Sequence, residues 1–347
     1  MRGGNVTRRR FIAGLGHALA LGVVPSVVHA QATSPPARPR RIFMVTWRGR
    51  TDVERGFTDY WREHGEPVEW IWRDAAQDRN ALAAIADEIS EARPDLVHTW
   101  GTPPTLGLAG PFAKPHPVIG REIPLVFSVV ADPIGVKLVS TLANPQRLIT
   151  GVTHVAPLSA QWEAMRTYRA FKRIGIVYNR AEPNANAVVA EWQALAAREG
   201  LQVFATPFNL NASQQPTIDG IDTILAALKG RGVDWLYLGP DSFLFTQIDT
   251  VAGLATALGI PTFAATESHL NSRAPVMVGL VSKFLHVGQF SAYKAMAMLG
   301  SERANRQEKV VPIEALRRFS FIVRMDTVRK LGIYPPLRLL DYAEFRD

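Results

Sequence analysis

Short apolar runs alternate with segments of helical spacing along the first part of this chain. From Asp52 to His64, apolar residues recur at the spacing of one helix face, and Leu82 to Ile89 repeats the pattern. The apolar runs have the length of buried strands and lie at 42–45, 68–72, 95–98 and 124–128. Strands that alternate with helices of about 10 to 15 residues are typical of a parallel α/β sheet.

The second part of the chain repeats the same landmarks in the same order. Residues 41–45 are echoed by 173–177, residues 94–97 by 233–236, and residues 123–127 by 260–263. The offsets are 132, 139 and 137 residues, so the repeat has nearly constant spacing. We therefore expect an α/β protein of two similar lobes, each a doubly wound parallel sheet with helices on both faces, and a ligand cleft between the lobes.

The first thirty residues have the order of an export signal. Arg2, Arg8, Arg9 and Arg10 occur without any acid, and residues 11–28 contain no Lys, Arg, Asp or Glu. Small residues then flank a histidine in Val28-His29-Ala30, and we expect cleavage after Ala30. The paired arginines indicate a twin-arginine signal. A disordered basic tail and an uncleaved anchor helix are the alternatives.

Composition limits the function of the mature chain. Residues 31–40 are a Pro-rich polar leader that we expect to be disordered, and about 315 residues remain for two domains. The net charge of +8 falls to +4 without the four arginines of the signal, which is too weak and dispersed to favour nucleic acid. There is no cysteine to form a disulfide, bind a metal or carry a lipid. We expect a soluble periplasmic monomer without a lipid anchor.

No sequence motif points to catalysis, a metal or a cofactor. Neither a His-Glu-x-x-His pattern nor a Gly-x-Ser-x-Gly pattern occurs, and Gly14-x-Gly16 lies inside the signal rather than between a strand and a helix. We therefore assign no catalytic residue, and we expect neither a metal nor a cofactor. An exported α/β enzyme is an alternative, because twin-arginine export handles folded cargo.

Open parallel sheets bind ligands at the carboxyl ends of their strands, which locates a candidate site. At these ends, Thr102 could cap a helix that begins beside the cleft, where free N–H groups suit a carboxylate. Trp47 and Tyr178 could contact the ligand or pack inside the lobes, and Arg48 could face a carboxylate or solvent. Asp132 fits a turn at least as well as a contact. The candidate contacts are Trp47, Arg48, Thr102, Thr105, Ser128, Asp132, Thr153, Tyr178, Asn179, Asp241, Ser242, Thr266 and Glu267.

Four segments together resemble the solute-binding proteins of ABC importers, in particular binders of aromatic and other amino acids. They are Asp132-Pro133-Ile134-Gly135, Thr150-Gly151-Val152-Thr153, residues 173–179 and Pro240-Asp241-Ser242. The resemblance implies the type I periplasmic-binding-protein fold. It also implies crossings between lobes near 152, 277 and 310–313, which gives a first lobe of 41–152 with about 277–311 and a second lobe of 153–276 with about 312–347.

The resemblance also implies a function. We expect capture of a small polar ligand, an amino acid or small carboxylate, for delivery to the membrane permease and ATPase of an ABC importer. Asp241 occupies the acidic position after proline and is the expected partner of the ligand's ammonium group, although Asp is also a favoured helix cap. A sensory ligand-binding partner of a receptor would use the same cleft and is the other alternative.

Overall fold

Strands from both halves of the chain form two large sheets and a short hairpin in the part of the protein that the structure describes. The computed structural model describes residues 38–347 except 65–66, 275 and 304–309, so the expected export signal and most of the leader lie outside it. The first sheet has the order β13-β5-β4-β3-β1-β2, and all its neighbours are parallel. Its strands are β1 (Arg40–Thr46), β2 (Val68–Asp74), β3 (Leu96–Trp100), β4 (Leu125–Ser128), β5 (Ile149–Thr153) and β13 (Glu314–Ala315).

The second sheet repeats this arrangement and extends it. Its order is β15-β14-β12-β11-β10-β6-β7. The strands are β6 (Arg173–Tyr178), β7 (Gln202–Pro207), β10 (Trp235–Leu238), β11 (Thr262–Ala264), β12 (Val278–Val281), β14 (Ser320–Arg324) and β15 (Glu344–Arg346), and β8 (Asn209–Leu210) pairs with β9 (Pro216–Thr217) in the hairpin. One feature differs from the expected parallel sheet: β14 runs antiparallel to β12. The chain leaves β12 for the first sheet and returns to β14 directly from β13, so it re-enters the second sheet at the end where β12 stops and runs back beside it.

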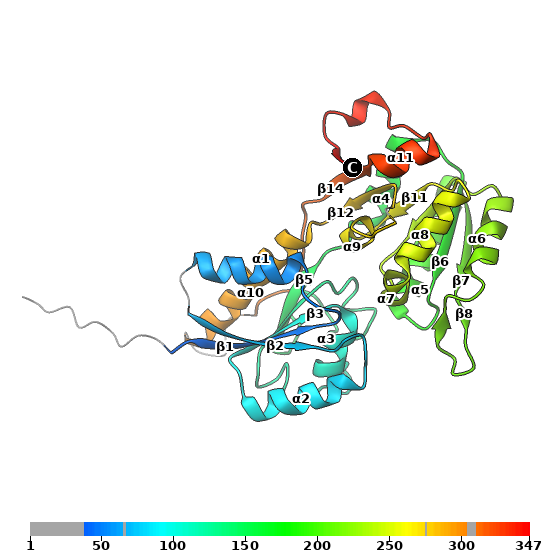
Figure 1. The fold of residues 1–347 in the computed structure, drawn as a ribbon. Helices are drawn as coiled ribbons and strands as arrows, with labels where there is room; N and C mark the ends of the chain where they lie inside the picture. The colour runs from blue at the N-terminus through cyan, green and yellow to red at the C-terminus, as the bar shows by residue number, and fades with distance from the viewer. Residues whose placement is uncertain (1–37, 65–66, 275, 304–309) are drawn as a thin grey trace, which may run out of the picture. The chain divides into compact units, whose positions relative to one another are not determined.

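The two sheets have corresponding strand orders, β2-β1-β3-β4-β5 and β7-β6-β10-β11-β12. The three sequence echoes fall on β1 and β6, β3 and β10, and β4 and β11. The prediction of two similar α/β lobes with the type I periplasmic-binding-protein fold is therefore confirmed. We call the first sheet with its helices the first lobe, and the second sheet with its helices the second lobe (Figure 1).

Helices cover both faces of each sheet because successive strand residues point to opposite sides. In β1, Phe43 and Val45 pack toward α2 and α3, whereas Ile42 and Met44 pack toward α1 and α10. The helices are α1 (Asp52–Glu63), α2 (Ala81–Ala92), α3 (Thr102–Ala109), α4 (Leu158–Tyr168), α5 (Pro183–Glu199), α6 (Ile221–Gly230), α7 (Ser242–Thr246), α8 (Ile248–Ala257), α9 (Glu267–Leu270), α10 (Phe284–Arg303) and α11 (Met325–Leu331), with a 3₁₀ turn η1 (Leu337–Leu339). Among the described residues, no helix is both long and apolar enough to cross a membrane.

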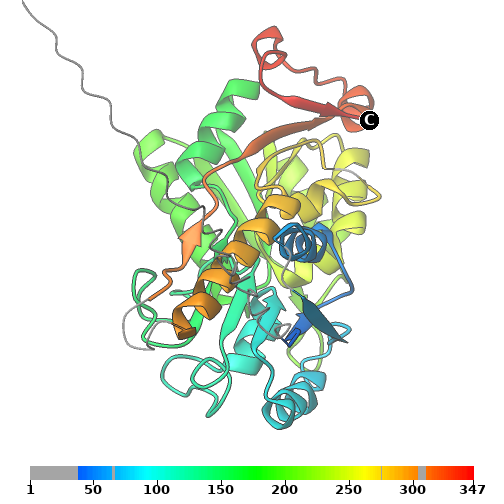
Figure 2. The same ribbon diagram turned by 90° about the vertical axis from the view of Figure 1, so that its left-hand side faces the viewer.

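Helices α1 and α10 lie side by side although more than 200 residues separate their ends (Figures 1 and 2). Glycine permits this approach. A Cβ atom on Gly288 would lie 1.9 Å from the carbonyl oxygen of Val53, and one on Gly56 would lie 2.1 Å from that of Leu285. The first lobe is thus completed by a helix from the last quarter of the chain.

The connections between the lobes fall slightly later than expected. β5 ends at Thr153, after the predicted crossing near 152. β12 pairs with β11 of the second sheet as far as Gly279 and ends at Val281, so the return to the first lobe follows 281 rather than 277. β13 pairs with β5 in the first sheet, so the last crossing follows Ala315 rather than 310–313. In each case strand pairing holds a few more residues on the lobe that the chain is leaving.

Candidate functional site

A cleft of about 480 Å³, its open mouth included, lies between the carboxyl ends of the strands of the two sheets. The first lobe contributes residues at or after the ends of β1, β3 and β4, and the second contributes residues that follow β10 and β11. His154, just after β5, and Asn184, in α5 after β6, complete the lining. The lining consists of Trp47, Arg48, Trp100, Gly101, Thr102, Pro103, Val129, Ala131, His154, Asn184, Pro240, Asp241, Ser242, Phe245, Thr266, Ser268 and His269. This is the edge at which open parallel sheets bind ligands.

Arg48 brings a positive charge into the cleft. Its guanidinium lies 4.5 Å from the centroid of the Trp100 ring and directly over the ring of Phe245. Among the described residues it has neither a hydrogen-bond acceptor nor an ion-pair partner. Burial lowers the pKa of Arg48 to about 9, so the side chain is still charged at neutral pH. A partly desolvated cation without a counter-ion favours an anionic ligand group, and guanidinium matches a carboxylate in a bidentate geometry.

Glu54 is the acid that most affects Arg48, but it compensates the charge only in part. The Glu54 carboxylate accepts hydrogen bonds from the backbone N–H of Thr51 (2.7 Å) and from its hydroxyl (2.8 Å), which closes a capping box at the start of α1. Burial raises the pKa of Glu54 to about 7. At neutral pH this carboxyl is therefore only partly ionised, and the positive charge of Arg48 is left for a ligand.

Asp241 places an acid on the second-lobe side of the cleft. One carboxylate oxygen accepts from the backbone N–H of Leu244 (2.9 Å) and caps α7, and the other accepts from that of Asn179 (2.6 Å). Burial, and then the charge of Glu182, raises the pKa of Asp241 to about 7. Glu182 itself accepts from the backbone N–H of Ser242 at 3.0 Å. Asp241 is thus a helix cap that also lines the cleft, and a cation from a ligand would stabilise its ionised form.

His154 and His269 add two neutral imidazoles to the lining. Both side chains are buried, and burial lowers the pKa of His154 to about 4 and that of His269 to about 3. Within the described part of the chain, neither ring has a hydrogen-bond partner on either nitrogen. Buried polar atoms of native proteins are nearly always paired, so these nitrogens suggest contacts that a ligand completes.

The structure brings six of the sequence-predicted contacts into the lining: Trp47, Arg48, Thr102, Asp241, Ser242 and Thr266. One detail of Thr102 was predicted wrongly, because Gly101 is the cap residue of α3 and Thr102 is the first helical residue. The backbone φ of 85° at position 101 is one that glycine adopts readily and threonine does not.

The other predicted contacts lie outside the lining, and several have partners within the protein. The hydroxyl of Thr105 bonds to that of Thr99 (2.8 Å), and the hydroxyl of Ser128 bonds to that of Ser291 (2.8 Å). Asp132 accepts from the backbone N–H of Gly135 in a turn (2.8 Å). Glu267 accepts from the backbone N–H of Phe284 at the crossing between the lobes. The remaining residues of this group are Thr153, Tyr178 and Asn179.

Several lining residues were not among the sequence candidates, chiefly Trp100, His154, Phe245 and His269. Trp100 closes a strand whose end was correctly expected at the cleft, so its position could have been read from the sequence. Phe245 belongs to a helix of a single short turn that carries too few residues for periodicity to indicate its inner face. His154 and His269 showed no spacing signal because they come from different segments of the fold.

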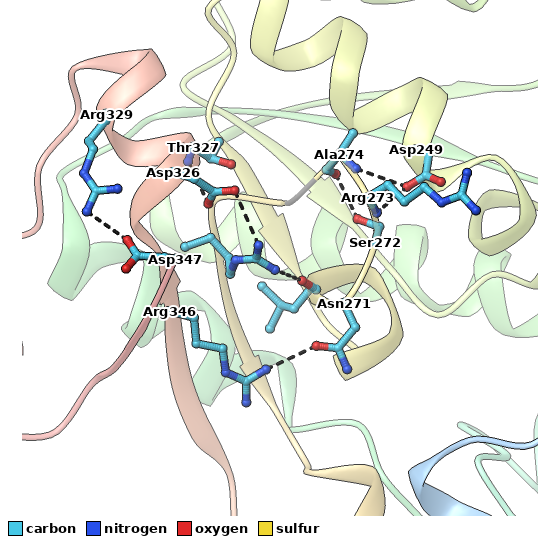
Figure 3. A network of polar contacts seen from close by, with 12 residues as sticks. Asp249, Asn271, Ser272, Arg273, Ala274, Asp326, Thr327, Arg329, Arg346 and Asp347 are labelled. Atoms are coloured by element: carbon cyan, nitrogen blue, oxygen red, sulfur yellow. Dashed lines mark hydrogen bonds and ion pairs between the residues drawn. The ribbon is translucent and has the colours of Figure 1, made fainter.

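Two arginines of the C-terminal segment contact the end of the short helix α9, which carries Ser268 and His269. Figure 3 shows one of them, Arg346, beside Asn271. Arg324 donates to the carbonyl oxygen of Leu270 at 2.7 Å, and Arg346 donates to the side chain of Asn271 at 3.2 Å. Arg346 also lies 3.8 Å from the Glu267 carboxylate. Strands β14 and β15, at one end of the second sheet, therefore brace α9, whose residues Ser268 and His269 line the cleft.

Residues 47–345 match the family described as ABC transporter substrate binding protein. The match spans most of the chain, and the protein belongs to this family. A relative among characterised proteins is the tyrosine-binding protein of Clostridioides difficile, which is 21% identical over 281 residues that cover 81% of this chain and 74% of that protein. The family and this relative are defined by binding of solutes rather than by catalysis.

Solved structures have the same fold. A conserved domain protein from Vibrio cholerae has a TM-score of 0.74 at 19% identity, with 89% of this chain and 100% of that chain covered. A Streptococcus pneumoniae ABC domain in complex with L-Trp has a TM-score of 0.73 at 20% identity, with 88% and 99% covered. Among the described residues of this chain, no group of three or more His, Cys, Asp or Glu side chains is placed to hold a metal ion.

Proposed function

We propose that this protein is the exported binding component of an ABC importer and that it captures an aromatic amino acid in the cleft between its lobes. The observation that carries the proposal is the guanidinium of Arg48, which is only partly compensated and faces the cleft among Trp100 and Phe245. An α-carboxylate would neutralise this charge. The aromatic side chains Trp47, Trp100 and Phe245 would cover an apolar ring.

The opposite charge of a zwitterion has a partner in Asp241. Burial and then the charge of Glu182 raise the pKa of this carboxyl, and the ammonium group of an amino acid would favour its ionised form. The tyrosine-binding relative and the neighbour that holds L-Trp support an aromatic amino acid as ligand. The permease and ATPase of an importer are the partners that this function requires, and we assign no catalytic residue to the cleft.

Calorimetry with matched ligands tests the proposal. L-Tyrosine, L-tryptophan and L-phenylalanine carry both charged groups, whereas 3-phenylpropionate lacks the ammonium and phenethylamine lacks the carboxylate. We expect binding of at least one of the three amino acids and loss of most affinity for both truncated compounds. If 3-phenylpropionate binds as tightly as the amino acids, Asp241 is not the partner of the ammonium group. Absence of binding by all three amino acids would overturn the proposed ligand class.

A further inference from the structure

The charges in the cleft leave the two imidazoles without a role. Arg48 offers enough N–H donors for a carboxylate, and Asp241 suffices for an ammonium group. His154 and His269 would then remain buried in the lining with unpaired ring nitrogens, in the part of the chain that the structure describes. A further polar group of the ligand would pair with these nitrogens, and this would be favourable because an unsatisfied buried polar atom is costly.

The protonation state of the two rings limits what this group can be. Burial keeps both imidazoles neutral at pH 7, and the nearby charge of Arg48 reinforces the effect on His269. The backbone of Leu238 acts weakly in the opposite direction on His269, yet no hydrogen bond of normal geometry forms there. A neutral imidazole has one N–H donor and one acceptor nitrogen. A carboxylate can only accept, so it could pair with the N–H groups but never with an acceptor nitrogen.

The surroundings of the rings indicate where this group sits in the ligand. His269 stacks beside Phe245 with ring centroids 6.2 Å apart, and His154 lies edge-on to Phe284 at 6.1 Å. Phe284 in turn meets Trp100 at 6.2 Å. The imidazoles are therefore embedded in the aromatic part of the cleft, where a flat apolar side chain would lie, and the polar group belongs on that side chain.

We propose that His154 and His269 are specificity residues that recognise a hydroxyl group on an aromatic ring. A phenol donates one hydrogen bond and accepts another, so it can satisfy an acceptor nitrogen of one imidazole and the N–H of the other. An indole N–H can only donate, and a phenyl ring can do neither. The proposal predicts that the protein binds tyrosine more tightly than tryptophan, and tryptophan more tightly than phenylalanine. This inference rests on the proposed function and adds to it the ring substituent that the cleft selects.

Titration of the wild-type protein with tyrosine and phenylalanine gives the first test. The two ligands share both charged groups and differ only in the hydroxyl. We expect tyrosine to bind at least about tenfold more tightly than phenylalanine, because bound phenylalanine would leave the buried imidazole nitrogens unpaired. Equal affinities would overturn the role of the imidazoles while leaving the proposed ligand class intact. Absence of binding by all three amino acids would instead overturn that class and this inference with it.

Substitution assigns the preference to the two rings. His154→Phe and His269→Phe keep a flat ring and remove both nitrogens, and each should bring the tyrosine-to-phenylalanine ratio close to one by weakening tyrosine alone. His98→Phe is the matched control, since His98 is fully buried but lies outside the lining and bonds to Ser128 at 2.9 Å. An unchanged ratio in both cleft variants would refute the proposal. If the variants do not fold, imidazole ¹⁵N chemical shifts in the wild-type protein decide: tyrosine should move them more than phenylalanine does, and equal shifts would refute it.

Discussion

The guanidinium of Arg48, just after β1 of the first lobe, lies over the ring of Phe245 in α7 of the second lobe. The contact joins two strand-end regions that are almost 200 residues apart in the sequence. This contact places a cation in the part of the cleft that residues of both lobes line. A ligand carboxylate placed there would therefore interact with both lobes at once through a single side chain.

Replacing Arg48 by Met should abolish most ligand binding without harming the fold. Met retains much of the apolar stem, but the ligand carboxylate loses its partner, which costs about 2–5 kcal/mol of binding energy. The ligand-free protein should melt at the same or a higher temperature, because a buried cation without a partner is removed. Calorimetry and thermal melting measure the two effects.

Arg50→Met is the control for this variant. Arg50 is exposed, and its guanidinium lies 3.7 Å from the ring centroid of Trp72, outside the cleft lining. We expect its affinity to match the wild type. Similar losses in both variants would show that general charge rather than the position of Arg48 governs binding.

The close crossing of α1 and α10 should make one glycine far more sensitive than another in the same helix. Gly288→Ala would drive a methyl group into the carbonyl of Val53, and backbone cannot move aside cheaply, so we expect a loss of at least about 2 kcal/mol in unfolding free energy. Gly300→Ala meets nothing within 4 Å and should stabilise the protein by about 0.5–1 kcal/mol. Chemical denaturation compares them, and equal effects would contradict the close crossing.

The sequence predicts the sheets better than the site, for a physical reason. Buried parallel strands such as β1 and β6 are short apolar runs, and their signal is local. β14 is different, since its antiparallel place beside β12 depends on a chain that returns from the first sheet. Pattern alone cannot reveal such a return.

The same distinction explains the candidate contacts. The rule about strand ends selected Trp47, Arg48 and the segment around Asp241, all of which line the cleft. It could not show that the hydroxyl of Ser128 is already bonded to Ser291, 163 residues away, or that the nitrogens of His154 are not bonded at all in the described chain. Whether a polar side chain is free for a ligand depends on neighbours that only the folded chain supplies.

The brace behind α9 should matter for affinity more than for stability. Arg346→Met removes the contacts to Asn271 and Glu267, so α9 loses support and His269 is held less firmly in the cleft. We expect ligand affinity to fall about three- to tenfold, the size of effect that indirect coupling commonly has. Arg329→Met is the control, because its exposed pair with Asp347 at 2.8 Å should contribute little. Equal affinities of the two variants would exclude a role for the brace.

Export should depend on the paired arginines near the start of the chain. Changing Arg8 and Arg9 together to Lys preserves the charge but not the twin-arginine pattern, so the uncleaved precursor should accumulate in the cytoplasm. Cell fractionation followed by mass determination of the periplasmic form measures both location and cleavage after Ala30. Undiminished export of the double variant would show that export requires only the positive charge and the apolar segment of the signal, not the paired arginines.

The pH dependence of binding should reveal the protonation of Asp241. Its pKa of about 7 lies above the ordinary value of 3.8, so the ligand-free folded protein holds a proton there that the unfolded chain has lost. The stability from this carboxyl is present below about pH 4 and is lost as pH rises through 7. Binding behaves in the opposite way, since an ammonium group pairs only with the ionised form. Affinity for an amino acid should therefore fall as pH decreases below about 7.

Asp241→Asn separates this charge effect from the capping role. Asparagine can still accept from the backbone N–H of Leu244, but it cannot accept from that of Asn179 as well, so the variant should lose some stability at every pH. Absolute affinity would mix both effects, whereas the slope of log Kd against pH does not. We expect calorimetry between pH 5.5 and 8 to show a slope in the wild type and a nearly flat line in Asp241→Asn.

Glu54 also titrates near 7 beside Arg48, and its protonation would strengthen carboxylate binding at low pH, so a slope of the wild-type sign cannot come from Glu54. Identical slopes in the two proteins would rule out Asp241 as the partner of the ammonium group.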